Sequence, residues 1–362
     1  MLLACSSLVT LVLVDSCLKA CTSETYCPSL HPKLRFENCC KFPAFCDYNA
    51  LGFRDREVGV PKPRDVFRVA VLGDSVAAGE HLSIDHTLAR QLERRLRELV
   101  VLPGRRIEVM NNAVRGYDVI QSEANLHHKV LPLEPDAVVY VFFTNDFVPT
   151  IGRGGVLFPD VLWDPKRDWH EDSLHGFLLR RSAIYLNVWT RRMLRDPVFV
   201  RGLDALRSRP AEMEYEALLR MADLCRAARI PLLVAVVPMH VLRDDGLPAC
   251  RERSRGIGLD PDNCDNEQDL VEAVLAFCRQ HDIDCRDMRP AYGRMGGADV
   301  GRKPDAIARR VHALAKLLPR KARDHLVEDR PDPIHPDETG TRALAEDIAA
   351  CLTPRLVGAT AR

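Results

Sequence analysis

The chain has 362 residues, of which 46% are hydrophobic and 28% charged, and its formal net charge is zero. This is the composition of an ordinary globular protein, and the length suits one large α/β domain with insertions or two smaller domains. A nucleic-acid-binding surface needs an excess of basic residues, so the charge balance argues against a nucleic acid as partner.

The first residues form an apolar segment. Residues 2–14 carry no charge, and this is the length of a signal-peptide core and too short for a relaxed membrane span. No basic residue precedes the segment. Residues 18–21 resemble a lipoprotein cleavage site only loosely, because Lys19 is the wrong residue type, and residues 2–5 fit such a site better only if the true start lies upstream. We expect residues 1–21 to be a signal or anchor segment, with membrane association through this end of the chain. The alternative is a hydrophobic segment without a targeting role.

The cysteines also favour export. Of 13 cysteines, seven lie within the first 46 residues, and Cys27, Cys39, Cys40 and Cys46 lie among prolines with little helical or strand periodicity. Such density in a short segment is typical of disulfides. We therefore expect residues 22–64 to be a Cys/Pro-rich N-terminal extension and the protein to be exported, whether periplasmic, secreted or membrane-anchored. Cys250 and Cys264 bracket a polar loop that a disulfide could close.

After this extension, apolar runs alternate with amphipathic segments. Strands are predicted over residues 67–72, 107–110, 137–143, 231–237 and 283–287, and helices over residues 87–100, 119–130, 212–228, 270–281 and 337–352. This alternation indicates an α/β fold in which a parallel sheet is covered by helices on both faces. We assign residues 65–356 to this domain, with insertions at about 147–210 and 292–330. The first insertion contains all three tryptophans, Trp163, Trp169 and Trp189.

Four short polar blocks follow predicted strands or precede the last helix. They are Gly73-Asp74-Ser75, residues 112–116 (Asn-Ala-Val-Arg-Gly), Thr144-Asn145-Asp146 and residues 332–335 (Asp-Pro-Ile-His). In open α/β sheets, ligands bind at the carboxyl ends of the strands. In this order the four blocks resemble the SGNH (GDSL-type) hydrolase family. The resemblance implies a flavodoxin-like, three-layer α/β/α sandwich with a five-stranded parallel sheet of strand order 2-1-3-4-5.

Ester cleavage by a serine needs a nucleophile, a base and donors for the oxyanion. Ser75 is the candidate nucleophile, His335 the candidate base, and Asp332 can hold the imidazole of His335 in the required tautomer. The resemblance implies an oxyanion hole formed by the N–H groups of Ser75 and Gly116 and the side-chain amide of Asn145. One position departs from the family, because Phe143 stands where its third block usually has glycine. This puts the shape of the pocket in doubt more than its chemistry.

The leading interpretation is a serine hydrolase that cleaves carboxylic esters of lipids, small molecules or acylated carbohydrates through an acyl-enzyme. One alternative is a carbohydrate O-acyltransferase that uses the same residues and excludes water. A second is a flavodoxin-like binding module without catalysis. Neither a phosphate-binding loop nor a metal-ligand cluster is apparent in the sequence, so no cofactor and no metal are expected. The acyl group, the alcohol and the oligomeric state stay open.

Overall fold

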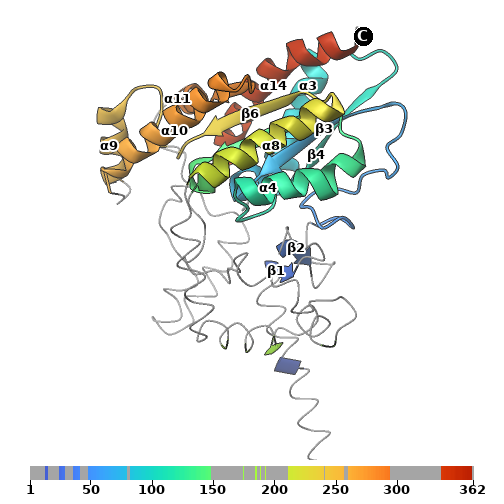
Figure 1. Ribbon diagram of the computed structural model, residues 1–362, viewed down its shortest axis with the longest axis horizontal. Coiled ribbons are helices and arrows are strands. Elements are labelled where there is room, and N and C mark those ends of the chain that lie inside the picture. The colour runs from blue at the N-terminus through green and yellow to red at the C-terminus, as the bar shows by residue number, and fades with distance from the viewer. Residues whose placement is uncertain are drawn as a thin grey trace, which may run out of the picture. The chain divides into compact units, whose positions relative to one another are not determined.

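The computed structural model describes residues 48–79, 82–147, 211–239, 241–256, 260–293 and 336–360, two short strands before them and a few single positions (Figure 1). Most of the insertion at 147–210, nearly all of that at 292–330 and the segment 332–335 lie outside the described residues. The division into segment, extension and domain therefore stays a prediction.

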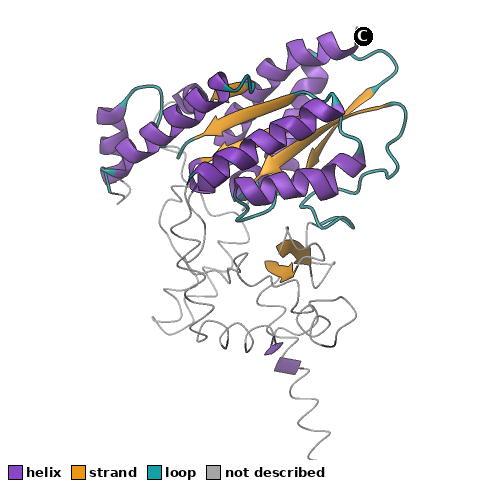
Figure 2. Cartoon of the chain, in the orientation of Figure 1, coloured by secondary structure: helices purple, strands orange, loops and turns teal. Residues whose placement is uncertain are grey.

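Five strands form one parallel sheet with flanking helices (Figure 2). The strands are β3 (Val66–Gly73), β4 (Arg106–Asn111), β5 (Ala137–Phe143), β6 (Leu232–Val237) and β7 (Cys285–Asp287). The order β4-β3-β5-β6-β7 is 2-1-3-4-5 when the strands are counted along the chain. Both the predicted fold class and the strand order are confirmed. All residues of β3, β5 and β6 are buried, which explains why these strands appear in the sequence as continuous apolar runs.

The chain divides into two compact units. One comprises residues 1–78 and 102–232 and contains β3, β4 and β5. Two of its helices, α4 (Val119–Asn125) and α8 (Glu212–Ala228), pack side by side (Figure 1). Apolar side chains of α8 such as Leu218 and Met221 are fully buried, so the helix contributes one face to the core of this unit.

The second unit comprises residues 79–101 and 233–362. Its α3 (Leu88–Leu99) packs along α14 (Glu338–Thr360), and its other helices are α9 (Leu247–Gly256), α10 (Asn263–Gln280) and α11 (Arg289–Gly293). On α3, the buried Leu88, Leu92 and Leu96 recur every four residues, as expected for the core-facing stripe of an amphipathic helix.

Several boundaries differ from those expected. Helix α10 begins at Asn263 rather than at 270, and α14 continues past 352 through Pro354. The expected helix over 119–130 is split into α4 and a π-helical turn, Leu126–Val130. Helices α9 and α11 were not predicted, because α9 carries only two buried residues, Cys250 and Ser254, and so leaves little apolar pattern.

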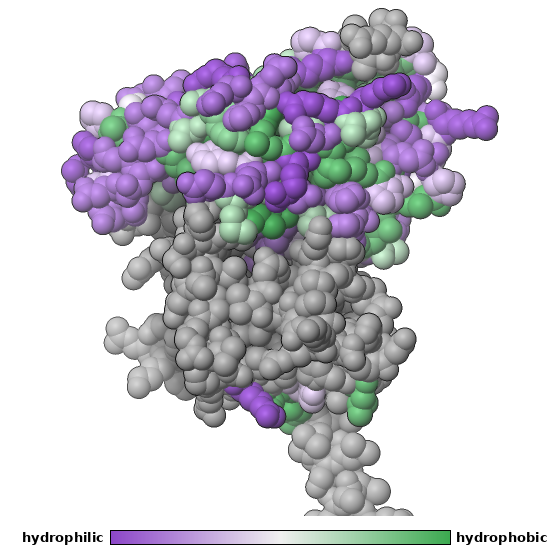
Figure 3. Space-filling view, viewed as in Figure 1, coloured by the Kyte–Doolittle hydropathy of each residue, from purple (hydrophilic) through white to green (hydrophobic). Residues whose placement is uncertain are grey.

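The Cys-rich extension contains a β-hairpin that its sequence did not indicate. Strand β1 (Glu24–Pro28) pairs antiparallel with β2 (Phe36–Cys40), and Cys39 lies opposite Thr25. A five-residue strand among prolines carries almost no periodic signal, so only the pairing reveals it. On the face shown in Figure 3, hydrophilic side chains cover most of the described surface, with smaller hydrophobic patches between them. No helix among the described residues has the length and apolarity needed to span a membrane.

Candidate active site

The first candidate residue, Ser75, directly follows the carboxyl end of β3. The strand ends at Gly73, and the short helix α2 (Ser75–Ala78) begins two residues later. Gly73 has a φ of 145°, and a Cβ at this position would lie 2.7 Å from the carbonyl oxygen of Val141 on β5. Only glycine therefore lets the chain leave the strand so close to its neighbour and begin α2 at Ser75.

Asp74 orders the turn that presents Ser75. Its Oδ1 accepts a hydrogen bond of 2.8 Å from the N–H of Val76, and its carbonyl accepts one of 3.0 Å from Ala78. The hydroxyl of Ser75 lies 3.4 Å from Oδ2 of Asp74, a long hydrogen bond in which the serine donates. Asp74 and Ser75 are 1% and 7% exposed. The Asp74 side chain thus caps α2 and limits where Ser75 can point.

The loop after β4 reaches the end of β3 and carries Gly116. The N–H of Asn112 donates to the carbonyl of Val71 at 2.8 Å, and the N–H of Val114 donates to that of Gly73 at 3.0 Å. Asn125 of α4 donates from its side chain to the carbonyl of Asn112 at 2.8 Å. These bonds hold the loop from both sides before it turns at Gly116.

Gly116 occupies a position that favours glycine. Its φ is 74°, in the left-handed region, where a Cβ is disfavoured. Two residues later, Asp118 caps the start of α4 with a capping box. The Asp118 carboxylate accepts a hydrogen bond of 2.8 Å from the N–H of Gln121, and the N–H of Asp118 donates one of 3.1 Å to the Gln121 side chain. The turn at Gly116 is therefore fixed by a helix start on one side and by the strand end on the other.

The third block continues β5 as a single turn of 3₁₀-helix, Thr144–Phe147. Asp146 in this turn is 1% exposed, and its Oδ2 accepts a 2.7 Å hydrogen bond from the hydroxyl of Tyr140. Phe143, at the family's glycine position, is also 1% exposed, so its ring is packed into the core. The backbone of Asn145 lies within the turn, whereas its side chain is outside what the structure describes.

Burial raises the pKa of Asp146 well above its ordinary range. The negative charge of Asp74 acts in the same direction, and the hydrogen bonds from Tyr140 and from the N–H of Phe143 act against it. Burial likewise raises the pKa of Tyr140, and the adjacent Asp146 adds to this shift. The pair is therefore not a source of a free phenolate.

Part of the N-terminal extension closes over the ends of β3 and β4. Oδ2 of Asp55 accepts a 2.8 Å hydrogen bond from the N–H of Asn111, and the Asn111 side chain donates to the carbonyls of Arg54 and Ala78. Asn111 is fully buried. These residues were not predicted to support the site. The signal that could have identified them is a charged pair, Arg54-Asp55, which begins two residues after Gly52.

Comparisons with solved structures find similar folds. The structure of TesA matches with a TM-score of 0.39 and 16% identity, over 79% of this chain and 98% of that one. An acetylxylan esterase from Geobacillus stearothermophilus matches with a TM-score of 0.39 and 13% identity, over 78% and 92%. A lipase/acylhydrolase from Enterococcus faecalis matches with a TM-score of 0.38 and 13% identity, over 80% and 96%. Comparisons with family models and with curated proteins find no match.

The chain resembles the SGNH (GDSL-type) hydrolases. Of the residues expected in an SGNH-type site, Ser75, Gly116 and the backbone of Asn145 follow the ends of three adjacent strands, β3, β4 and β5. Asp332 and His335 lie outside the described residues.

The described residues hold no group of three or more His, Cys, Asp or Glu side chains arranged to bind a metal ion. His240, which follows β6, and the three tryptophans of the first insertion also lie outside the described residues. The described part of the candidate site thus comprises Ser75 and the loops that carry Gly116 and Asn145.

Proposed function

We propose that the protein is a serine hydrolase that cleaves carboxylic esters through an acyl-enzyme intermediate. The observation that carries the proposal is the position of Ser75, the first residue of α2 after the end of β3, beside the loops that carry Gly116 and Asn145. A helix start directs N–H groups toward a bound anion. The tetrahedral intermediate of ester cleavage is such an anion.

In the proposed reaction, Oγ of Ser75 attacks the ester carbonyl carbon while the imidazole of His335 accepts the hydroxyl proton. The N–H groups of Ser75 and Gly116 and the amide of Asn145 donate to the resulting oxyanion. As the intermediate collapses, His335 returns the proton to the departing alcohol. Water then attacks the acyl-serine with His335 as base, which releases the carboxylic acid and restores Ser75. Asp332 orients the imidazole throughout.

Small-molecule, lipid and acylated-sugar esters all remain substrate candidates for this site. Transfer of the acyl group to a carbohydrate would follow the same first half-reaction, with a sugar hydroxyl in place of water. A panel of p-nitrophenyl esters of rising chain length together with acetylated xylan separates the substrate classes. Adding free sugar to the panel separates hydrolysis, which yields only the acid, from transfer, which yields a new ester.

We also propose that the protein is exported, because its cysteines favour disulfide formation. In the described part of the chain Cys250 and Cys264 form a disulfide between α9 and α10, as expected from the sequence. Disulfides persist in oxidising compartments. We expect at least one further disulfide among Cys27, Cys39, Cys40 and Cys46 in protein isolated from its native compartment. Peptide mapping without reduction tests this, and four free thiols there would contradict export.

Labelling with a fluorophosphonate tests the function on the full chain. The probe should modify Ser75, and Ser75→Ala should abolish both labelling and ester hydrolysis while the protein stays folded. Ser83 provides a matched control, because its hydroxyl lies 3.1 Å from Nδ1 of His86, an exposed serine–histidine contact that the proposed reaction does not use. Ser83→Ala should be labelled like the wild type. An unlabelled wild-type protein, or labelling that survives Ser75→Ala, would contradict the proposal.

A further inference from the structure

Asp146 is a buried carboxyl group that the proposed reaction does not use. It follows Asn145 in the turn after β5 and is 1% exposed. Its Oδ2 accepts two hydrogen bonds, from the Tyr140 hydroxyl at 2.7 Å and from the N–H of Phe143 at 3.2 Å. Its Oδ1 is buried and has no hydrogen-bond partner within the part of the chain that the structure describes.

Within the part of the chain that the structure describes, no cationic group balances a charge on Asp146. The titratable groups that act on it are Tyr140 on β5, Asp74 beside Ser75 and Asp118 at the start of α4, and each of them is acidic. Burying a carboxylate without a cationic partner is strongly unfavourable, and a second carboxylate nearby makes it worse. A proton on Asp146 removes both costs. The raised pKa of this group, caused first by burial and then by Asp74, is in agreement.

The hydrogen bonds of Asp146 also define the turn. Its side chain bonds back to the N–H of Phe143, the last residue of β5, and to Tyr140, three residues further up the same strand. The turn between Phe143 and Asp146 is therefore tied to the strand at two points. Asn145 lies inside this closed loop, so a change at Asp146 would shift the backbone from which the Asn145 side chain extends.

From this geometry we propose that Asp146 is a neutral carboxylic acid whose bonds to Tyr140 and Phe143 position the turn that carries Asn145. Asp146 is then a positioning residue for the oxyanion hole. The second half of this inference rests on the proposed function, whereas the protonated state of Asp146 does not.

The protonated state is tested without any activity measurement. Infrared difference spectra between wild type and Asp146→Asn at neutral pH should show the carbonyl stretch of one neutral carboxylic acid that the variant lacks. Asp136→Asn is the matched control, because that carboxylate is paired with Lys62 at 2.9 Å, and its loss should leave this band in place. A spectrum of the wild type without the band overturns the proposal even if the protein proves not to be an esterase.

The positioning role is tested by kinetics. Asparagine resembles a neutral carboxylic acid in shape, so Asp146→Asn should keep kcat within about threefold of wild type, whereas Asp146→Ala should lower kcat at least about tenfold with little change in KM, as for a weakened oxyanion donor. Tyr140→Phe keeps the ring and serves if the alanine variant does not fold. It should lower kcat relative to the wild type, and by less than Asp146→Ala does where that variant folds. If Asp146→Asn and Asp146→Ala lowered kcat equally, the positioning role would be overturned. It would also be overturned if neither Asp146→Ala nor Tyr140→Phe lowered kcat.

Discussion

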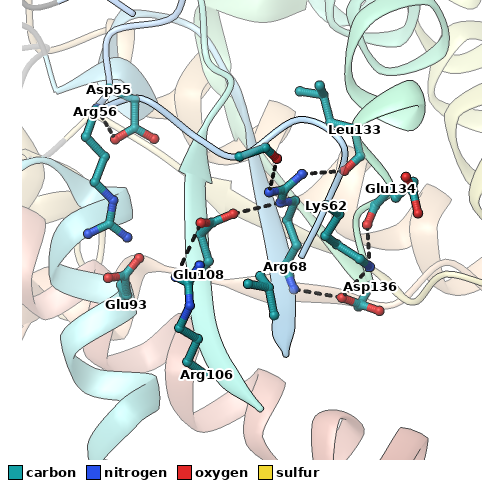
Figure 4. A network of polar contacts seen from close by, with 12 residues as sticks. Asp55, Arg56, Lys62, Arg68, Glu93, Arg106, Glu108, Leu133, Glu134 and Asp136 are labelled. Atoms are coloured by element: carbon teal, nitrogen blue, oxygen red, sulfur yellow. Dashed lines mark hydrogen bonds and ion pairs between the residues drawn. The ribbon is translucent and has the colours of Figure 1, made fainter. Parts of the chain in front are cut away.

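The guanidinium of Arg68 and the carboxylate of Glu108 form a buried ion pair between adjacent strands, with 2.7 Å between Nε and Oε1 (Figure 4). The two residues lie opposite each other in the β3–β4 register, and the Arg68 side chain is fully buried. Its remaining N–H groups donate to the carbonyls of Leu133 and Gly59 at 2.7 and 2.8 Å. This pair lies near the amino end of β3, away from the strand end that carries Ser75.

Replacing Arg68 should destabilise the fold severely without touching the chemistry. Arg68→Met removes the donor of the buried Leu133 carbonyl and the closer partner of Glu108, which keeps only its 3.6 Å ion pair with Arg106. Loss of one partner of a buried pair costs about 3–5 kcal/mol. Chemical denaturation measures this. Arg95→Met is the control, because its pair with Glu98 is exposed and should contribute about 0.3–0.5 kcal/mol. If the two variants were equally stable, the buried network would not matter for stability.

Gly73→Ala should damage both stability and activity. The new methyl group would meet the carbonyl oxygen of Val141 at 2.7 Å and Cβ of Ala77 at 2.8 Å, and a φ of 145° is itself unfavourable for alanine by about 1–3 kcal/mol. Because Ala77 belongs to α2, relief of the clash moves Ser75. Gly256→Ala at the end of α9 meets nothing within 4 Å and should be neutral or slightly stabilising. An active, stable Gly73→Ala protein would contradict the close packing of β3 on β5.

Asn145→Ala should lower kcat by about 10²–10³, the usual effect of removing one oxyanion donor, with little change in KM. The expectation follows from the position of Asn145 in the turn Thr144–Phe147. Steady-state kinetics on a p-nitrophenyl ester, with the fold checked by circular dichroism, measure it. A kcat equal to that of the wild type would remove Asn145 from the site.

The stability of the protein should depend on pH through Asp146. Its pKa is raised by folding, so the folded protein holds this proton more tightly than the unfolded chain, in which an Asp titrates near about 3.9. The contribution of Asp146 to the free energy of unfolding is therefore complete below about pH 4 and declines as pH rises toward the raised pKa. The difference in unfolding free energy, wild type minus Asp146→Asn, should fall over this range.

Urea denaturation at several pH values measures this difference. Asp223→Asn is the control, because Asp223 lies on the exposed side of α8 and pairs with Arg226. Its difference from wild type should vary with pH less than that of Asp146→Asn. A difference for Asp146→Asn that rises with pH would mean that the folded protein prefers the ionised carboxylate.

The disulfide between Cys250 and Cys264 should stabilise the second unit. The two cysteines are 14 residues apart in the sequence, and closing a loop of this size contributes about 3 kcal/mol by constraining the unfolded chain. Reduction, or the double replacement of both cysteines by alanine, should lower the thermal midpoint. Cys225→Ala affects a buried thiol in the other unit and separates the loss of packing from the loss of the bond. A midpoint unchanged by reduction would contradict a stabilising disulfide.

The amino-acid sequence by itself was sufficient to predict which segments form the strands of the sheet and where the first three motifs lie along the chain. Strand β5 and helix α8 lie at the predicted residues, because a long apolar run bounded by turn residues and a long amphipathic segment each have one stable arrangement. The position of Ser75 after a buried strand is equally local information. The order of the strands in the sheet cannot be predicted from local sequence patterns. It was predicted from the resemblance of the four motifs to those of the SGNH hydrolases.

Only the tertiary structure decided which polar groups meet. Nothing in the spacing of Tyr140 and Asp146 indicates that a strand residue and a turn residue share a hydrogen bond, and nothing near Asn111 predicts that Asp55 binds its N–H. The hairpin of β1 and β2 and the pair of Arg68 and Glu108 likewise depend on strand register. Sequence patterns record which side chains avoid water, whereas the partner of a buried polar group is set by the path of the whole chain.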